Sequence, residues 1–407
     1  MHIDLNSCFA TIEQQAHPAF RNKPLVMAAY TTPSGCVIAP SIEAKKLGIK
    51  LGMTVRDAKS ICHNVIVRTT DTVLVRDVHI KFKKLFKEYS PKVTPKSIDE
   101  AVIDFAGTSY MKSENGLVQA ALEIKQRMKD EIGDWLKCSI GISTSSFLAK
   151  TGAGLHKPDG LTVITHDNLE EIYGQMELID ICGINVKLRA RLNAYNIYTP
   201  LDFLKADIDD LQKRVFKSIN GFHWYFRLRG WEMDDVVLKR KSFGQNYSLP
   251  KPVKDIKELS RIVMKMCEKM GRRLRHNGFS AQGVHVACIY NDWTHWHRGR
   301  KFHMPLFTTN ELFTKTILIL NEQPDKKPIT KFSVSCFDLI AGETPQLSLF
   351  DTQIDKKREL SKAMDKINDR YGEYIVTPAL MIGMGGEIVD RISFGGVREL
   401  ESLYDMG

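Results

Sequence analysis

The chain lacks several features that would assign it to a specialised class of protein. Its eight cysteines are scattered without any Cys-x-x-Cys spacing, so neither a disulfide framework nor a zinc site is expected. No apolar run is long enough to cross a bilayer, and no basic flank and apolar core mark a secretory signal. No internal repeat or low-complexity tract is evident. These absences exclude secreted disulfide-rich proteins and membrane-spanning proteins, and indicate a reducing cytoplasm with no membrane partner.

Positive charge is present in excess and is unevenly distributed. The 407 residues have a formal charge of +10. The segment 239–301 contains 15 Lys and Arg against 4 Asp and Glu, a net of +11, which leaves −1 for the remainder. Such a concentration of charge attracts polyanions, which favours a nucleic-acid partner. The alternative is a solvated helix face, because five basic residues fall at helical spacing: Lys257, Arg261, Lys265, Lys269 and Arg272.

Three acidic residues lie in apolar surroundings. Asp99 and Glu100 occupy the segment 97–101 (Ser-Ile-Asp-Glu-Ala), where a strand-turn-strand would place both acids at the turn. Asp4 lies in a short apolar strand at 1–5. Carboxylates brought together are tolerated if they share divalent cations, and hard oxygen ligands suit Mg²⁺. Two such ions can stabilise the attacking and leaving oxygens of a phosphoryl displacement. Without further context, an Asp-Glu pair is more often a solvated turn.

The pattern along the chain predicts an α+β protein of two to four domains. A module of strands and helices is expected at 11–70, an amphipathic helix at 117–132, and strands at 138–143 and 161–164. Residues 165–235 are helical and strand-poor in pattern. Residues 242–340 are expected to run strand, helix, strand, strand, helix, strand. A last helix is expected through Leu360, Met364 and Ile367.

The segment 97–101, taken with Asp-Leu-Asn-Ser-Cys-Phe at 4–9, resembles the Y-family DNA polymerases, most closely their bacterial DNA polymerase IV and UmuC-like branch. The resemblance extends over residues 1–350. It implies a multidomain right-hand polymerase. The palm would comprise 1–10 and 71–164, the fingers 11–70, the thumb 165–238 with a helix-hairpin-helix, the little finger 242–340, and a clamp-binding peptide and tail 341–407.

The resemblance implies a two-metal site that holds two Mg²⁺ ions. Asp4, Asp99 and Glu100 would be the catalytic residues and metal ligands, and the carbonyl of Leu5 would be a further ligand. Phe9 would act as a steric gate against the 2′-hydroxyl of ribonucleotides. The alternative is that Phe9 is an ordinary core residue on an amphipathic helix.

Further positions contact the incoming nucleotide by the same resemblance. Ser7, Cys8, Lys45 and Lys157 would bind the triphosphate, while Ala29, Cys36 and Ile38 would cover the nascent base pair. Lys45 stands where many relatives have Arg, and a lysine binds phosphate as a point charge. Ala39 and Ile42 stand where many polymerase IV enzymes have hydroxyl donors, a departure that favours the UmuC-like branch.

Two regions are expected to contact DNA phosphates. The segment 181–192 resembles a helix-hairpin-helix, in which Gly183 and Asn185 would direct backbone N–H groups at a phosphate. Asn185 replaces a glycine of the family, and Asn tolerates left-handed backbone better than most residues. In the little finger, Arg298, Arg300 and Lys301 lie on one expected strand. Because side chains alternate along a strand, Arg298 and Arg300 should share one face.

The segment 346–350, with residues Gln346, Leu347, Ser348, Leu349 and Phe350, closely matches the peptide by which bacterial polymerases hold the sliding clamp. Gln346 would enter a polar pocket, and Leu349 with Phe350 would fill an apolar one.

The function expected from these features is template-directed, low-fidelity DNA synthesis in translesion repair by a monomer. Its partners would be primer-template DNA, deoxynucleoside triphosphates and the sliding clamp. Two alternatives stay open. One is a non-catalytic DNA- and clamp-binding accessory protein derived from such an enzyme. The other is a different two-metal palm enzyme, such as a nucleotide cyclase.

Overall fold

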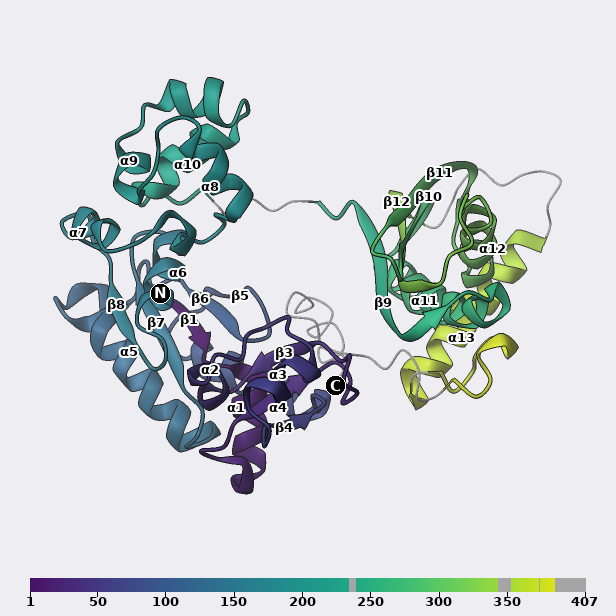
Figure 1. The fold of residues 1–407 in the computed structure, drawn as a ribbon, viewed down its shortest axis with the longest axis horizontal. Helices are drawn as coiled ribbons and strands as arrows, with labels where there is room; N and C mark the ends of the chain where they lie inside the picture. The colour runs from purple at the N-terminus through teal and green to yellow at the C-terminus, as the bar shows by residue number, and fades with distance from the viewer. Residues whose placement is uncertain (234–238, 343–352, 373, 385–407) are drawn as a thin grey trace. The chain divides into compact units, whose positions relative to one another are not determined.

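The computed structural model describes residues 1–233, 239–342, 353–372 and 374–384 (Figure 1). It divides into two compact units, which are described separately. Unit 1 is built mainly from Met1–Val236, and unit 2 from Val237–Asp390. The mixture of helices and sheets confirms the expected α+β class. None of the described helices is both long and apolar enough to cross a bilayer.

The central element of unit 1 is a five-stranded mixed sheet with the strand order β5-β6-β1-β7-β8. The central strand β1 pairs antiparallel with both β6 and β7, and β7 pairs parallel with β8. Helices pack on this sheet through one apolar core that includes Ile3, Ile12, Phe86 and Ile124. The strands are β1 (His2–Leu5), β5 (Val93–Pro95), β6 (Glu100–Ile103), β7 (Cys138–Ile142) and β8 (Leu161–Val163); the helices are α1 (Cys8–Ala16), α4 (Thr72–Lys87), α5 (Gly116–Arg127) with the π-helical turn η3 (Met128–Ile132), and α6 (Ser146–Leu155).

Gly141 sets the distance between α6 and the sheet. A Cβ atom at this position would collide with the backbone carbonyl of Ala149 on α6. Only glycine therefore allows α6 to lie this close to β7. The close approach also brings Lys150 of α6 toward the edge of the sheet where β1 and β6 meet.

A second, smaller sheet confirms the module expected at 11–70. Its order is β3-β2-β4, with β2–β3 antiparallel and β2–β4 parallel. Side-chain caps start its helices: Ser41 accepts from the N–H of Ala44, and Thr54 forms a capping box with Asp57. The elements are β2 (Leu25–Ala28), β3 (Val37–Pro40), β4 (Ile66–Arg68), α2 (Ile42–Lys46) and α3 (Val55–Ile61).

The last part of unit 1 is helical, as its sequence predicts. A separate apolar core, with Phe203, Leu211 and Trp224 among its members, holds these short helices together. They are α7 (Leu169–Gly174), α8 (Val186–Asn193), α9 (Pro200–Lys205) and α10 (Asn220–Leu228).

Unit 2 contains a four-stranded antiparallel sheet with the order β11-β10-β12-β9. Alternate residues of β10, including Val284, Val286 and Cys288, share an apolar core with Val263 and Met266 of α11. The order of elements confirms the strand and helix pattern expected for 242–340. The elements are β9 (Ser242–Val253), α11 (Ile256–His276), β10 (Phe279–Tyr290), β11 (His295–Leu306), α12 (Thr309–Leu320) and β12 (Ile329–Ala341).

The tail after β12 is also part of unit 2. Helix α13 (Gln353–Tyr371) turns polar residues toward α11, where Asp365 pairs with Arg275 at 2.5 Å and Asp369 with Arg272 at 2.8 Å. Beyond α13, the carbonyl of Met384 accepts a hydrogen bond from Lys265 at 2.9 Å. Lys265 is 3% exposed. The solvated helix-face alternative is therefore wrong for this part of α11, because the tail covers it.

Candidate active site

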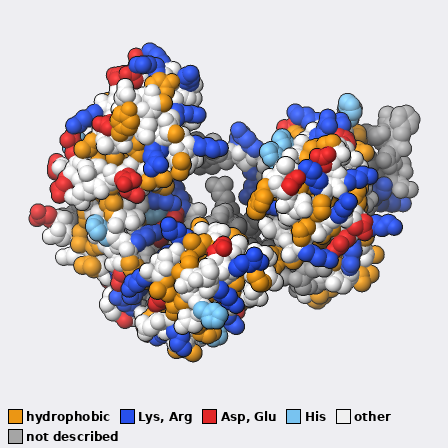
Figure 2. Space-filling model, in the orientation of Figure 1, with side chains coloured by type: hydrophobic (Ala, Val, Ile, Leu, Met, Phe, Trp, Pro, Cys, Tyr) orange, Lys and Arg blue, Asp and Glu red, His pale blue; other side chains and the backbone are white. Residues whose placement is uncertain are grey.

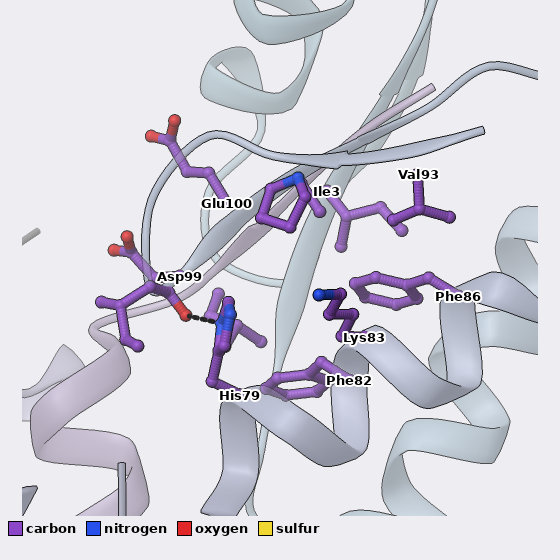
Figure 3. A pocket seen from close by; sticks show the side chains of 12 residues that line it. Ile3, His79, Phe82, Lys83, Phe86, Val93, Asp99 and Glu100 are labelled. Carbon is purple, nitrogen blue, oxygen red and sulfur yellow. Dashed lines mark hydrogen bonds between the residues drawn. The ribbon is translucent and has the colours of Figure 1, made fainter. Parts of the chain in front are cut away.

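Strand pairing brings the predicted acids to one edge of the five-stranded sheet. Asp4 lies directly opposite Glu100 in the β1–β6 register. Asp99 is the last residue of the turn before β6, and its carbonyl accepts a 2.9 Å hydrogen bond from the N–H of Leu5. Figure 3 shows the carboxylates of Asp99 and Glu100 directed away from the apolar cavity beneath them. The expected strand-turn-strand is confirmed, but only Asp99 lies in the turn, because Glu100 is already the first paired residue of β6.

Two lysines provide positive charge to this acidic cluster. The Nζ atom of Lys157 lies 2.7 Å from Oδ1 of Asp4, and the Nζ atom of Lys150 lies 2.6 Å from Oε2 of Glu100. The side chains of Lys157 and Lys150 are 41% and 40% exposed, so both can move away from the carboxylates into solvent without disrupting the core. Each ammonium group stands where a bound cation would meet a carboxylate oxygen.

Burial and the neighbouring charged groups set the pKa values of the three carboxyl groups. Burial raises the pKa of Asp4 to about 6, although the charge of Lys157 opposes the shift. Burial also raises the pKa of Asp99, against a hydrogen bond from the Ser97 hydroxyl. Burial acts in the same direction on Glu100, but the hydrogen bond from Lys150 outweighs it and lowers the pKa of Glu100.

The donor set fits a hard divalent cation. Among the described residues, ligand atoms of His2, Asp4 and Glu100 lie within 4.8 Å of one another. Asp99 is outside that group, and its Oδ1 accepts a hydrogen bond from Ser97 Oγ at 2.5 Å. His2 is 1% exposed, and burial lowers its pKa to about 4, so its imidazole is neutral. Charged carboxylate oxygens at this spacing are the ligands that Mg²⁺ prefers.

Phe9 packs in the core below the acidic cluster. It lies in the first turn of α1 and is 2% exposed. The core-phenylalanine interpretation is thus confirmed as a packing role. The steric-gate role stays a prediction, since it depends on the edge of the ring that faces a bound sugar.

The residues expected at the triphosphate lie near the same acids. Lys45 is on α2, and its pKa is lowered by burial and by the nearby charge of Lys157. Ser7 precedes α1 with a left-handed backbone, φ 52°, and its buried Oγ has no hydrogen-bond partner among the described residues. Cys8 is buried. Its thiol is therefore shielded from solvent.

The residues expected over the nascent base pair lie on the β2–β3 hairpin. The N–H of Ala29 bonds the carbonyl of Cys36 at 2.8 Å, which places these two residues side by side. Cys36 is exposed, Ile38 is half-buried, and the intervening Val37 is fully buried. Cys36 and Ile38 therefore share the face opposite to the core of this small sheet.

The hairpin before α8 differs from its prediction in one detail. Gly183 has the left-handed backbone, with φ 91°. Asn185 is extended, with φ −100°, and its side chain caps α8 by accepting from the N–H of Leu188. The expected left-handed backbone at Asn185 is therefore wrong, because the residue serves as a helix cap and not as a turn residue.

The basic strand β11 has its expected alternation, but its arginines already have a partner. Arg298 and Arg300 share one side of the strand, and both pair with Glu322, at 3.3 and 2.7 Å. Lys301 pairs with Asp338 at 2.5 Å. Figure 2 shows Lys and Arg side chains prominent on unit 2, with acidic side chains among them. DNA contact by these residues stays a prediction.

The clamp-like peptide 346–350 lies outside the described residues. The sequence pattern did not predict Lys150 and His2 as neighbours of the acids. The only sequence signal for Lys150 is its position shortly before Lys157, on the helix that follows β7.

Known protein families and relatives match this chain over most of its length. Residues 3–153 match the model of the impB/mucB/samB family, and residues 240–349 match the C-terminal domain of the same family. A DNA polymerase IV from Pelotomaculum thermopropionicum is 28% identical over 394 residues, covering 95% of this chain and 96% of that protein. DNA polymerase IV 1 of Bacillus subtilis is 28% identical over 383 residues, covering 92% of this chain and 91% of the relative.

Solved structures show the same fold. A Y-family DNA polymerase chimera of Dbh and Dpo4 superposes with a TM-score of 0.74 at 23% identity, covering 84% of this chain and 99% of the other. DinB from Sulfolobus solfataricus gives a TM-score of 0.52 at 23% identity, with the same coverage.

Proposed function

The chain belongs to the impB/mucB/samB family of Y-family DNA polymerases, and from this membership we propose how its residues perform the family reaction. The protein is a DNA-directed DNA polymerase, a nucleotidyltransferase of translesion synthesis, with the right-hand architecture of the family. It uses divalent metal ions. Neither the accessory-protein alternative nor the cyclase alternative has support in these relatives.

The observation that supports the proposal is the cluster of Asp4, Asp99 and Glu100 at one sheet edge. We assign these residues as ligands of two Mg²⁺ ions, with the Leu5 carbonyl as a further ligand. When bound, such ions stabilise the attacking and leaving oxygens of the transfer. Lys157 and Lys150 neutralise the carboxylates at 2.7 and 2.6 Å until cations arrive. Lys157, once released from Asp4, is free to bind a phosphate alongside Lys45.

We propose the following domains. The five-stranded sheet and its helices form the palm, 1–10 and 71–164. Residues 11–70 form the fingers, 165–238 the thumb and 242–340 the little finger. We place primer-template DNA against Gly183 and Asn185 in the thumb and against β11 in the little finger. Phe9 supports the sugar of the incoming deoxynucleotide. We propose that the protein acts as a monomer in the bacterial cytoplasm, which contains both its DNA and its nucleotide substrates.

Primer extension tests the enzyme assignment. The full chain with Mg²⁺ should add deoxynucleotides to a primer on an undamaged template and across an abasic site. The metal-free reaction is the control. If the protein binds primer-template DNA yet extends neither primer, the accessory-protein alternative is correct.

We further propose that 346–350 binds the bacterial sliding clamp. The support is the peptide sequence itself, which ends in the apolar anchors Leu349 and Phe350. Replacing both anchors by Ala should abolish the stimulation of synthesis by the clamp, because each hot-spot truncation costs on the order of 2 kcal/mol. Clamp-free synthesis should be unchanged. Full stimulation of the double variant would show that the clamp is held elsewhere.

A further inference from the structure

A buried histidine reaches the backbone of the catalytic turn from the neighbouring helix. His79 lies on α4 and is 8% exposed. Its Nδ1 atom lies 3.0 Å from the carbonyl oxygen of Ile98, the residue directly before Asp99 (Figure 3). A carbonyl oxygen can only accept, so the imidazole must carry its proton on Nδ1 and donate.

This hydrogen bond is one of a pair that holds the backbone on both sides of Asp99. The carbonyl of Ile98 accepts from His79 on α4, and the carbonyl of Asp99 accepts from the N–H of Leu5 on β1 at 2.9 Å. Both carbonyls that flank the Asp99 Cα atom are therefore fixed, from opposite elements. The direction in which the Asp99 side chain points therefore depends on both hydrogen bonds.

The β-sheet ladder does not supply the first of these bonds. Pairing of β5 with β6 stops at Pro95 and Ala101, and the N–H groups of Lys96 and Ser97 both bond the carbonyl of Glu100. The peptide between Ile98 and Asp99 thus lies beyond the regular sheet. A side chain from outside the sheet is needed to hold it.

The turn also borders a small cavity. A cavity of about 20 Å³, room for roughly one water molecule, lies beneath it. Its lining includes His79, Phe82 and Phe86 of α4, together with Ile98 and Asp99. Because the turn has free space below it, loss of the imidazole would let the Ile98 carbonyl move inward and rotate the Asp99 carboxylate.

We propose that His79 is a positioning residue, which fixes the Ile98–Asp99 peptide and so directs the Asp99 carboxylate at the bound metal ions. The inference rests on the metal-ligand role proposed above for Asp99. His79 does not touch substrate or metal. It acts through one backbone hydrogen bond.

Three variants separate positioning from packing. His79→Leu removes the donor, whereas His79→Asn retains an N–H near the position of Nδ1. Phe82→Leu, one turn along α4, disturbs the same cavity without touching the Ile98 carbonyl. For each variant, kcat and the KM for a deoxynucleotide are measured in single-nucleotide insertion. Mn²⁺ affinity is measured without turnover by electron paramagnetic resonance, and Tm is measured by calorimetry.

His79→Leu should lower kcat by about 10- to 100-fold and weaken Mn²⁺ binding several-fold, as expected when a group behind a metal ligand is removed. His79→Asn should recover kcat to within about threefold of the unmodified protein. Phe82→Leu should lower Tm but leave kcat and Mn²⁺ affinity within about threefold.

Two results would overturn the inference. One is a kcat and Mn²⁺ affinity of His79→Leu equal to those of the unmodified protein. The other is equal loss in His79→Leu, His79→Asn and Phe82→Leu, which would indicate packing alone. Asp99→Asn is measured in parallel. If it keeps full activity, the role proposed for Asp99 fails first; if it is inactive while His79→Leu is normal, only the inference fails.

Discussion

The acidic cluster of unit 1 and the basic face of α11 in unit 2 both concentrate charge of one sign, and they are neutralised differently. Lys157 and Lys150, which face the acids, have side chains about two-fifths exposed. Arg275, which faces the tail, has a side chain 4% exposed and makes further bonds to Phe307 and Thr309. The counter-charges in unit 1 can be exchanged for other cations. Those in unit 2 are built into the fold.

The comparison predicts that removing an acid from the exchangeable cluster affects chemistry and little else. Asp99→Ala or Glu100→Ala should reduce primer extension by at least about 10³-fold, because phosphoryl transfer depends on metal positioning. DNA affinity should change by less than about threefold. Extension is followed on gels and binding by fluorescence anisotropy. Near-normal extension by either variant would refute the two-metal assignment.

Breaking the built-in pair in unit 2 should instead affect stability. Arg275→Met leaves Asp365 without its closest partner, and breaking a buried ion pair costs about 3 kcal/mol of unfolding free energy. Denaturant unfolding measures the loss. Lys257→Met, on an exposed part of α11, is the matched control and should change stability by less than about 0.5 kcal/mol. Equal stability of the two variants would mean that the tail does not stabilise unit 2.

The buried carboxyl group of Asp4 should make metal affinity depend on pH, and Lys157 should set where the dependence begins. Burial raises the pKa of Asp4 to about 6, so lowering the pH from 7.5 to 5.5 protonates this ligand, and Mg²⁺ affinity should fall by up to about tenfold per pH unit below 6. Lys157→Met removes a charge that lowers this pKa, so the loss should begin at a higher pH.

Lys150→Met is the comparison for that titration, because Lys150 pairs with Glu100 and not with Asp4. Calorimetric Mg²⁺ titrations at several pH values check both variants. An identical pH profile for Lys157→Met and the unmodified protein would show that the lysine does not control Asp4.

The smallest expected effect concerns the exposed arginines of β11. Replacing Arg298 and Arg300 together should flatten the slope of log affinity against log salt by about one unit for each phosphate that the protein no longer neutralises. Glu322→Gln should do the opposite, because it releases both guanidinium groups from their shared partner at 3.3 and 2.7 Å. Slopes unchanged in both variants would exclude β11 from the DNA-binding surface.

Local patterns in the sequence were sufficient for most of the fold and for placing the acids at the end of a strand, whereas the metal-ligand role of the acids was predicted from the family resemblance. The segment 97–101 spans the expected turn and the start of β6, because the apolar residues on either side of it pair as strands. The apolar residues of α11 predicted its buried face, since Val263, Met266 and Met270 recur at helical spacing and all lie in the core. Both predictions needed only neighbours in the chain.

The failures came from partners distant in sequence. Nothing near Glu100 indicates that Lys150, fifty residues later, will bond it. The basic residues of α11 suggested solvent or DNA, yet Asp365 and Asp369 reach them from about a hundred residues away. At Asn185 the residue type was compatible with two backbone conformations, and the cap on α8 decided between them.

The exposure of Cys36 gives the protein a natural attachment point for a reporter. Five of the eight cysteines are buried, two are half-buried, and Cys36 alone is exposed. Thiol reagents modify accessible thiolates, so a maleimide dye at neutral pH should react first at Cys36. That residue lies on the hairpin proposed to cover the nascent base pair. The native sequence would thus allow nucleotide binding to be followed by fluorescence, with no engineered cysteine.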